Sequence, residues 1–462
     1  MSNKSKLSDF ISIKHGFAFK GEFISTEENE NCLLTPGNFA IGGGFKSDKF
    51  KFYTGNVPSD YILNSNDLIV TMTDLSKDAD TLGYSALVPN IQNKQMLHNQ
   101  RIGLVIFIND ELDKEYLYFL MRSKEYRHHV VSTATGSTVK HTSPSKILSF
   151  EFDKPTLEQQ KKIAKYLLSF ENKIQLNTQT NQTLEQIAQA IFKSWFVDFD
   201  PVKAKINALA NGGTHVDAER AAMQIISGKT DAELTQMQQT TPAAYKTLEK
   251  TAALFPSEMV ESELGDVPKG WLIQPIKDFG EIICGKTPSK QKQEYYEGNI
   301  PFIKIPDMHS NIFITETNEY LSELGANSQP RKFLPKGSIC VSCIATVGKV
   351  SIVSKLSQTN QQINSIKPYN KVYSEYLYFY MLSLKETFIA LASAGSATLN
   401  MNTTTFSNVK ILNPQIELIS HFKEIIGVKF DRILGNQLEI NTLSRIRDSL
   451  LPNLLSGNLN ID

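Results

Sequence analysis

Cysteine and long apolar runs are both scarce in this chain of 462 residues, and each scarcity excludes a class of protein. Four cysteines in a chain of this length do not form the dense disulfide framework of small secreted domains. No stretch approaches the roughly 18 consecutive apolar residues of a membrane-spanning helix, and the polar start of the chain does not resemble a secretory signal. With 41% hydrophobic and 21% charged residues, we expect a cytoplasmic, globular protein of two or three domains.

An excess of charge of either sign is lacking too, because 48 basic residues balance 48 acidic ones. The total charge therefore gives no indication of a nucleic-acid partner. Residues 271–414, with 14 basic and 10 acidic residues, favour an anionic partner for that segment only. Phosphate binding by such a chain would depend on a few placed cations.

Motifs of catalytic chemistry are absent from the sequence. It contains no H-E-x-x-H zinc pattern and no G-x-S-x-G nucleophile loop. Cys340 and Cys343 form a lone C-x-x-C without a histidine pair at ligand spacing, so buried thiols are favoured over a metal site. We therefore expect neither catalytic residues nor a metal site in this chain.

One segment does match a nucleotide-binding pattern. Residues 280–287 read Gly, four residues, then Gly-Lys-Thr, the formula of a phosphate-binding loop. Such a loop needs backbone N–H groups that curl around phosphates and a helix that follows directly. Here Ile282 and Ile283 suit a buried strand, and Pro288 follows the threonine. A nucleotide-hydrolysing enzyme that uses this loop, including Gly280, remains an alternative hypothesis.

The most informative feature is an internal duplication of roughly 200 residues. Glu-Tyr-Leu-Tyr-Phe at residues 115–119 recurs at 375–379, and Asn-Gln at 99–100 recurs at 360–361. In the last part of each copy, equivalent residues are separated by a constant 259 positions. A chance match would not keep such a register, so the chain contains two copies of one unit.

Each copy divides into two parts. Residues 1–155 and 271–413 contain short β-branched runs broken by Gly, Asn and Pro, which predicts strands with a few helices. Residues 156–198 and 414–462 show apolar residues at alternating spacings of three and four, which predicts one long helix in each copy. Residues 199–270, the connector, are either a linker or a docking surface for a partner.

The apolar stripe of the two helices has the 3.5-residue period of a coiled coil, so we expect the helices to pack together. Thr156 and Gln159 match a capping box at the start of the first helix. Asn177 and Asn436 occupy the same position in the two copies and either lock the register of the pair or point to solvent. The predicted stripe, together with these two asparagines, consists of Ile163, Leu167, Phe170, Ile174, Leu184, Ile187, Ile191 and Trp195 in the first helix and Phe422, Ile426, Ile433, Ile440, Leu443, Ile446 and Leu450 in the second.

Polar, glycine-bearing loops recur at equivalent places in both copies and are the candidate nucleic-acid contacts. Lys, Ser and Thr bind phosphates, whereas Asn, Gln, Arg and His read base edges. A single lysine is more often solvated surface, so the prediction concerns the loops acting together. The candidate residues are Lys14, His15, Lys20, Lys46, Lys49, Lys140 and His141 in the first copy and Lys286, Thr287, Ser289, Lys290, Lys292, Asn400 and Asn402 in the second.

With these loops and the duplication, the chain resembles the specificity subunit of type I restriction-modification systems. The matching stretches include Phe-Val-Asp-Phe-Asp-Pro-Val at 196–202, Gly-Asp-Val-Pro-Lys-Gly-Trp at 265–271 and Leu-Leu-Ser-Gly at 454–457. The resemblance implies an α+β fold in which two duplicated α/β target recognition domains are joined by two long helices. Those helices would pack as an antiparallel coiled coil in a pseudo-twofold arrangement.

The same resemblance implies a DNA-recognition subunit without catalytic activity. Each recognition domain would read one half of a bipartite, asymmetric site in double-stranded DNA, and the helices would set the half-site spacing. Two methyltransferase subunits would dock around the helices, and two restriction/translocase subunits would join them. S-adenosylmethionine, ATP and Mg²⁺ would be held by those partners. An interaction scaffold without DNA binding is a second alternative hypothesis.

Overall fold

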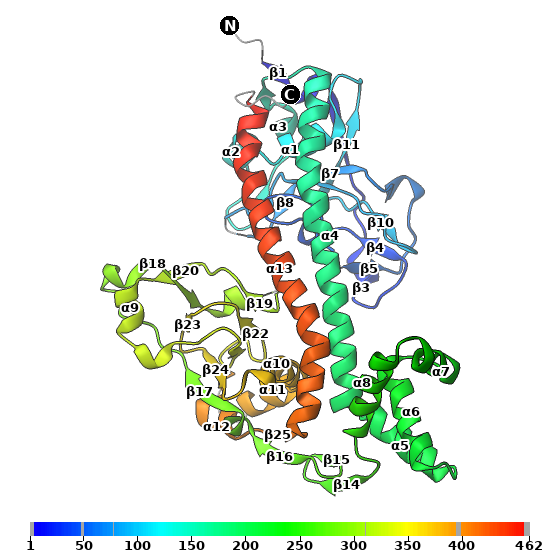
Figure 1. Cartoon of the computed structure of the whole chain (residues 1–462). Coiled ribbons are helices and arrows are strands. Elements are labelled where there is room, and N and C mark those ends of the chain that lie inside the picture. Colours follow the sequence, from blue (N-terminus) through cyan, green and yellow to red (C-terminus); the bar gives the residue numbers. More distant parts are fainter. Residues whose placement is uncertain (1–3, 48–49, 77, 310, 394–398, 457–462) are drawn as a thin grey trace. The chain divides into compact units, whose positions relative to one another are not determined.

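The computed structural model describes residues 4–47, 50–76, 78–309, 311–393 and 399–456. The chain forms two compact units, and each contains the first part of one copy of the duplicated sequence (Figure 1). Unit 1 consists of Met1–Leu176 and Ile440–Asp462, and unit 2 of Asn177–Glu439. We call residues 1–155, in unit 1, the first domain and residues 271–413, in unit 2, the second domain. Each long helix contributes one stretch to each unit.

The two domains are built on the same antiparallel sheet. Its strands are β2 Ile11–His15, β7 Leu68–Thr71, β9 Ser85–Leu87 and β11 Ile102–Phe107 in the first domain, and β17 Gly280–Cys284, β19 Phe313–Ile314, β21 Ile339–Ser342, β22 Val350–Val353 and β24 Ile363–Pro368 in the second. The first sheet has the order β2-β11-β7-β9. The second repeats it as β17-β24-β21-β22 and adds β19, which runs parallel to β22. The predicted duplication is therefore confirmed by strand order.

A second sheet also recurs. Its strands are β3 Ile24–Ser25, β4 Asn31–Leu33, β5 Lys51–Tyr53, β6 Ile62–Leu63 and β10 Gln95–Leu97 in the first domain, and β18 Tyr296–Ile303, β20 Glu319–Leu321 and β23 Gln358–Thr359 in the second. The orders are β3-β5-β4-β10-β6 and β20-β18-β23. Each contains one parallel pair, β4 with β10 and β18 with β23. The second domain is thus a shorter version of the first.

A short two-stranded sheet closes each domain where the chain enters and leaves it. In the first domain, β1 Ser5–Lys6 pairs with β13 Glu151–Phe152. In the second, β16 Leu272–Pro275 pairs with β25 Lys410–Asn413. The strands on which the chain enters and leaves each domain are therefore neighbours.

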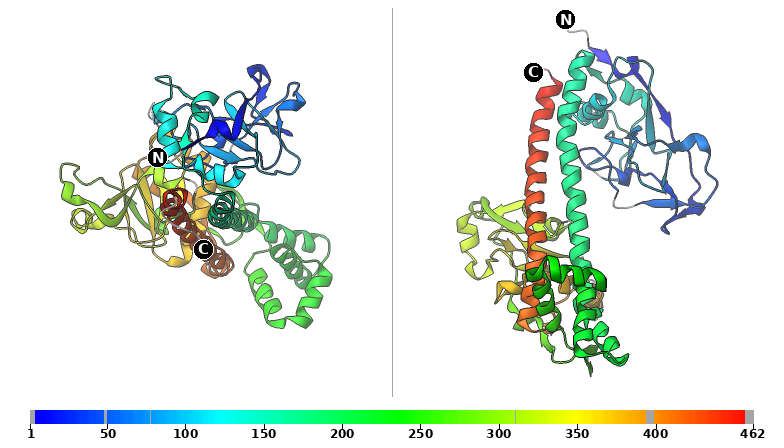
Figure 2. Two further views of the ribbon diagram at one scale, coloured as in Figure 1. Left: turned by 90° about the horizontal axis from the view of Figure 1, so that it is seen from above. Right: turned by 45° about the vertical axis from the view of Figure 1, so that its right-hand side comes forward.

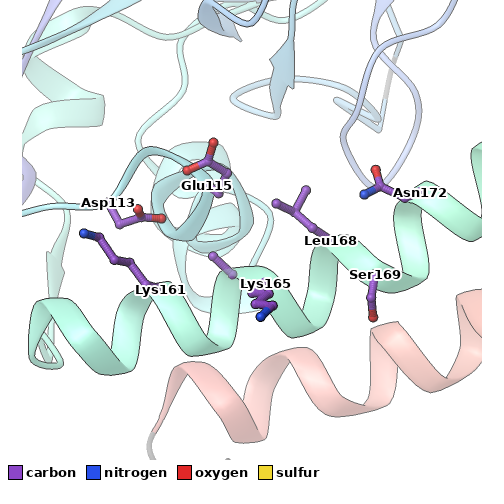
Figure 3. Close-up of a pocket in the computed structure, with 8 residues that line it drawn as sticks. Asp113, Glu115, Lys161, Lys165, Leu168, Ser169 and Asn172 are labelled. Carbon is purple, nitrogen blue, oxygen red and sulfur yellow. The ribbon is translucent and has the colours of Figure 1, made fainter.

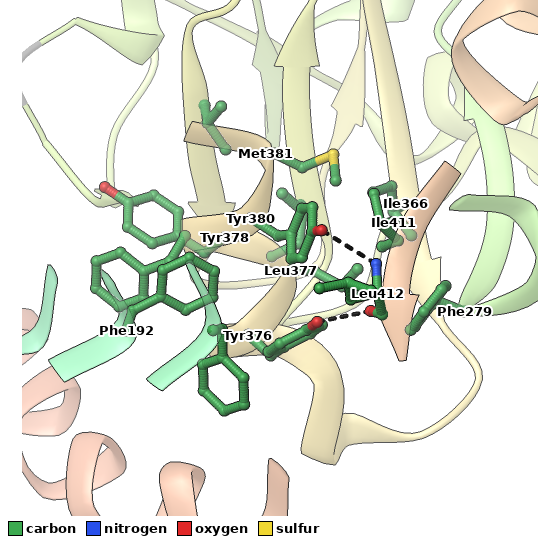
Figure 4. Packing of buried hydrophobic residues seen from close by; sticks show 14 of the residues in the cluster. Phe192, Phe279, Ile366, Tyr376, Leu377, Tyr378, Tyr380, Met381, Ile411 and Leu412 are labelled. Atoms are coloured by element: carbon green, nitrogen blue, oxygen red, sulfur yellow. Dashed lines mark hydrogen bonds between the residues drawn. The ribbon is translucent and has the colours of Figure 1, made fainter. Parts of the chain in front are cut away.

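The repeated pentapeptide forms a buried helix in each domain. The helices of the domains are α1 Lys114–Leu120, α2 Lys124–Ser132 and α3 Pro144–Leu148, and then α9 Glu323–Asn327, α10 Ser374–Ser383, α11 Lys385–Ser393 and α12 Thr403–Asn408. In α10, the Tyr376 hydroxyl donates to the Leu412 carbonyl (2.6 Å), and the Leu412 N–H donates to the Tyr380 hydroxyl (3.1 Å; Figure 4). These two bonds fix α10 to β25. The aromatic residues of the repeated pentapeptide are part of the buried core, which explains why they recur.

The long helices are α4 Leu157–Phe196 and α13 Ile416–Leu455, and they run side by side (Figures 1 and 2). The predicted capping box is confirmed, because the Thr156 N–H donates to Gln159 Oε1 (3.1 Å) and the Gln159 N–H to Thr156 Oγ1 (3.3 Å). A helix of 40 residues is about 60 Å long. Each helix is continuous across the boundary between the units.

Hydrogen bonds show that the helices are antiparallel. In unit 2, Asn177 Nδ2 donates to Glu439 Oε2 (2.8 Å) and Asn436 Nδ2 donates to Asn181 Oδ1 (2.8 Å), so residue numbers fall along α13 as they rise along α4. Asn177 and Asn436 are both buried and do not point to solvent. They bond to residues of the opposite helix and not to each other. This arrangement favours a role in fixing the register.

The rest of the predicted stripe divides into three groups. The buried residues are Ile163, Leu167, Trp195, Phe422, Ile426 and Ile433, and the half-buried ones are Phe170, Ile174, Leu184, Ile191, Ile440, Leu443 and Leu450. The prediction was wrong for Ile187 and Ile446, which are 41% and 39% exposed. An α-helix has 3.6 residues per turn, so a stripe drawn with a strict 3.5-residue period drifts around its surface. Ile187 and Ile446 are equivalent positions in the two copies, so the prediction fails at the same place in both helices.

The connector is a folded helical segment and not an extended linker. It consists of α5 Asp200–Ala210, α6 His215–Ser227, α7 Asp231–Thr240 and α8 Pro242–Ala253, followed by the hairpin β14 Met259–Ser262 and β15 Gly265–Pro268. Met223, Leu234 and Leu248 form part of its small core. The ammonium of Lys205, which is 2% exposed, donates to Glu219 Oε1 (2.7 Å) and to the Phe255 carbonyl (2.6 Å). None of the helices in the described part of the chain is long and apolar enough to span a membrane.

The glycines shared by the two copies are required by close backbone contacts. A methyl group added at Gly16 would overlap the carbonyl oxygen of Asn99, and one at Gly285 would overlap that of Asn360. Because both obstacles are backbone atoms, a rotamer change cannot relieve the overlap. We expect Gly16→Ala to destabilise unit 1 by about 1–3 kcal/mol, the usual cost of overpacking. Denaturant unfolding measures this, with Gly21→Ala as the control, since no atom lies near an added methyl group there. Equal stability of the two variants would contradict the prediction.

Candidate nucleic-acid interface

The predicted loops of the first domain meet at one end of its main sheet. Strand β2 ends at His15, which pairs with Gly103 at the start of β11. Strand β7 ends at Thr71, and β8 Thr73–Asp74 then pairs with β12 Lys140–His141. Lys14, His15, Lys140 and His141 therefore lie at the same end of the sheet, which we call the reading edge of the first domain.

Asp74 fixes Ser76 and Thr81, two residues of the loop after β8. The buried Asp74 carboxylate accepts hydrogen bonds from the N–H groups of Ser76 (2.7 Å) and Thr81 (2.5 Å) and from the Thr81 hydroxyl (2.8 Å). Burial alone would raise the pKa of Asp74, but these bonds outweigh it and lower the pKa. Beside the loop, His141 Nδ1 lies 3.2 Å from Thr73 Oγ1. These hydrogen bonds therefore fix the positions of polar groups at the reading edge.

The other candidates of the first domain have separate positions. Lys14 Nζ donates to the Asp60 carbonyl (2.8 Å) and lies 4.9 Å from the centre of the Tyr61 ring. Lys20 is exposed, with Glu22 3.9 Å away. Lys46 is exposed on the loop that precedes β5. Lys49 lies outside the described residues.

The second domain has an equivalent reading edge. The loop after β17 contains the exposed Lys286 and the half-buried Thr287, whose hydroxyl donates to Gln361 Oε1 (2.7 Å). Asn400 forms a β-bridge with Ile344, as His141 pairs with Thr73 in the first domain. Asn402 has a structural role, because its side chain accepts the Thr405 N–H (2.8 Å) and caps α12. The remaining candidates, Ser289, Lys290 and Lys292, are exposed further along the loop, where Lys292 Nζ donates to the Tyr295 hydroxyl (3.1 Å).

The structure contradicts the nucleotide-binding hypothesis for residues 280–287. The first five of these residues form β17. The Gly285 N–H donates to the Ile363 carbonyl (3.1 Å) and the Lys286 N–H to the Thr359 carbonyl (2.9 Å), so these donors do not face a phosphate. Residues 288–292, all of them described, form no helix. The pattern is a coincidence of a buried strand and a turn.

An ionic cluster that the sequence does not indicate joins the first domain to both long helices in unit 1. Glu171 of α4 accepts hydrogen bonds from Arg122 Nη1 (2.5 Å), Arg447 Nη1 of α13 (3.0 Å) and the Tyr118 hydroxyl (2.6 Å). Arg122 Nε also donates to the Gly42 carbonyl (2.7 Å). The sequence does not indicate these contacts, because a single glutamate on the polar face of a helix is usually a solvent-exposed residue. The cluster fixes structure and does not perform chemistry.

A cavity of about 450 Å³ lies between α4 and α1 in unit 1 (Figure 3). It is lined by Asp113, Glu115, Lys161, Ala164, Lys165, Leu168, Ser169 and Asn172. In the second domain, Lys423 occupies the position equivalent to Ala164, and its ammonium donates to Glu375 Oε2 (3.0 Å). The cavity therefore follows from the smaller residue in the first copy. Its lining contains no pair of nucleophile and base.

The thiols are structural, as the sequence predicts. Burial raises the pKa of Cys340 to about 12 and that of Cys343 to about 11, so both remain protonated at neutral pH. Among the described residues, no three His, Cys, Asp or Glu side chains are grouped to hold a metal ion. The features shared by the two domains are thus a common scaffold and a polar reading edge.

Comparison with known proteins identifies the class. The family described as type I restriction modification DNA specificity domain matches residues 2–186 and again residues 268–444. Since these matches cover most of the chain, the chain belongs to this family of DNA specificity proteins. The resemblance noted in the sequence is therefore confirmed.

Individual relatives are specificity subunits. The chain is 48% identical over 357 residues to the HindI specificity subunit of a type I restriction enzyme from Haemophilus influenzae, a match covering 75% of this chain and 77% of that protein. It is 25% identical to the MjaIX specificity subunit from Methanocaldococcus jannaschii, over 82% and 76% of the two chains. The type I restriction-modification S subunit from M. genitalium shares the fold, with a TM-score of 0.55 at 15% identity over 98% and 96% of the chains.

Proposed function

We propose that this chain is the DNA sequence-recognition subunit of a type I restriction-modification complex, in which each domain reads one half of a bipartite site. The observation that supports this is the pair of reading edges, which share a scaffold but present different side chains. Lys140 and His141 in the first domain correspond to Leu399 and Asn400 in the second. Two unlike readers on equivalent frames recognise two unlike half-sites, whereas a symmetric dimer reads a palindrome.

The chemistry in this proposal belongs to partner proteins in the cytoplasm. Two methyltransferase subunits would dock on α4 and α13, two restriction/translocase subunits would join them, and these partners would hold S-adenosylmethionine, ATP and Mg²⁺. The helices would set the spacing between half-sites. The balanced charge of this chain fits a complex in which the partners supply much of the phosphate contact.

Methylation mapping tests the proposal. DNA from cells that contain this chain and its methyltransferase should show a bipartite methylated motif that disappears when the chain is deleted. Exchanging residues 1–155 for the corresponding domain of another specificity subunit should change one half of the motif only. The reciprocal exchange of residues 271–413 is the matched control and should change the other half. A motif that survives deletion, or an exchange that alters both halves, would contradict the proposal.

A further inference from the structure

One turn is built identically in the reading edges of both domains. In the first domain the Ile102 N–H donates to the Asn99 carbonyl (2.9 Å), and in the second the Ile363 N–H donates to the Asn360 carbonyl (3.3 Å). The Asn side chain closes each turn again, because Asn99 Oδ1 accepts the Arg101 N–H (3.2 Å) and Asn360 Oδ1 the Gln362 N–H (3.1 Å). The asparagine of each repeated Asn-Gln pair therefore has a structural role, because it closes the turn.

The turn is also fixed from outside. The Phe17 N–H donates to the His98 carbonyl (2.8 Å), as the Lys286 N–H does to that of Thr359. The Met72 N–H donates to the Arg101 carbonyl (2.9 Å), and this bond recurs in the second domain. The shared glycines described above allow the backbones to approach this closely. The turn is therefore a rigid platform in each reading edge.

The platform presents one side chain that both copies retain. Gln100 and Gln361 follow the turn asparagines and are both exposed. Their neighbours differ, since Arg101 corresponds to Gln362. The Gln100 amide forms no hydrogen bond within the described part of the chain, and Gln361 receives only the Thr287 hydroxyl at its Oε1. The exposed Gln100 side chain therefore has no hydrogen-bonding role in the described fold, whereas Gln361 at the equivalent position accepts one bond from a loop of the same reading edge.

We propose that Gln100 and Gln361 each contact the edge of an adenine, one in each half of the DNA site. This inference rests on the proposed function. A primary amide offers one donor and one acceptor side by side, which matches N7 and the N6 amino group of adenine in the major groove. Phosphate oxygens accept hydrogen bonds only and would leave the amide oxygen unpaired. A shared reader residue implies that the two half-sites, although different, share an adenine at equivalent positions.

The test uses the complete complex with its methyltransferase subunits. Binding to a library of duplexes is measured for the wild type and for Gln100→Ala and Gln361→Ala. Each variant should lose roughly tenfold to hundredfold in affinity for the preferred site, the discrimination of one bidentate base contact. Gln100→Ala should relax one adenine position in the first half-site only, and Gln361→Ala one in the second. Gln92→Ala, at another exposed glutamine of the first domain, is the control and should change neither.

A second variant tests whether the base preference itself changes. A carboxylate accepts hydrogen bonds without donating, so Gln100→Glu should shift the preferred base at that position from adenine towards cytosine, whose N4 amino group donates. Thermal unfolding should be unchanged in all variants, because the side chain is exposed. Equal loss for every sequence, unaltered specificity or a lowered melting temperature would overturn the assignment. If the wild type still reads a bipartite motif in those cases, the proposed function stands without it.

Discussion

Replacing Glu171 with alanine is expected to destabilise unit 1 by about 3–5 kcal/mol, the cost of removing one partner from a buried ion cluster. Arg122 has a side chain that is only 3% exposed, and Arg447 one that is 16% exposed. Without the carboxylate, the buried Arg122 guanidinium would lose its anionic partner, Arg447 would be left with Asp448, and the Tyr118 hydroxyl would lose its acceptor. The penalty is large because the cations stay buried.

The distribution of tryptophan makes this measurable. The two tryptophans, Trp195 and Trp271, both belong to unit 2. In a guanidinium titration of Glu171→Ala, the circular dichroism transition should move to lower denaturant while tryptophan emission moves much less. Glu158→Ala is the matched control on α4, since Glu158 is 81% exposed in its side chain and pairs with the exposed Lys162. A shift in Glu158→Ala as large as in Glu171→Ala would refute the role of burial.

The same cluster sets a pH dependence. Burial alone would raise the pKa of Glu171, but the charges of Arg122 and Arg447 and the hydrogen bond from Tyr118 outweigh it and lower the pKa. Because the folded-state pKa lies below the unfolded one, the stabilisation is complete above about pH 5 and is lost as the pH falls through the folded-state value. Glu171→Ala should therefore lose stability relative to the wild type at neutral pH and approach it in acid.

Phe192→Ala is expected to destabilise unit 2 by about 3–5 kcal/mol, as for other buried phenylalanines. Phe192 of α4 is 3% exposed and contacts the rings of Tyr376 and Phe379 of α10 and Phe422 of α13 at centroid distances of 5.5–6.0 Å (Figure 4). Its removal leaves a cavity at the point where three helices meet. Tryptophan emission during denaturant unfolding reports the loss directly.

Ile187→Ala provides the control for Phe192→Ala. Ile187 lies on the same helix, five residues earlier, but is 41% exposed. Its truncation should change the free energy of unfolding by about 0.5 kcal/mol or less. If Ile187→Ala were as costly as Phe192→Ala, the position of the apolar face of α4 would be wrong.

The sequence was sufficient for the fold because local and repeated signals agree. The capping residues Thr156 and Gln159 located the start of α4, and the repeat predicted that both domains share one topology. The 3.5-residue period wrongly placed Ile187 in the stripe. Over several turns, a 3.5-residue pattern moves around a helix of 3.6 residues per turn and away from the buried face. The folded nature of the connector was not evident, since Lys205 reads as a surface residue until Glu219 and the Phe255 carbonyl are placed beside it.

The reading edges were only partly predictable. The sequence located the loops through their glycines and lysines, but side-chain type does not reveal which groups are already used. Asn402 was a candidate contact and caps α12, whereas Gln361 was not a candidate and is exposed. The Asn402 cap is a local bond to Thr405, which an N-cap pattern can indicate. The exposure of Gln361 depends instead on tertiary hydrogen bonds between distant segments, for example that of Lys286 with Thr359, and no local pattern encodes those.

The pairing of β1 with β13, and of β16 with β25, has an evolutionary consequence. Each domain is entered and left on adjacent, paired strands. Recombination in the gene can therefore replace a whole domain, because its two junctions lie side by side in the folded protein. The long helices are inherited unchanged. Under the proposed function, a host lineage can thus acquire a new half-site by exchanging about a third of this gene.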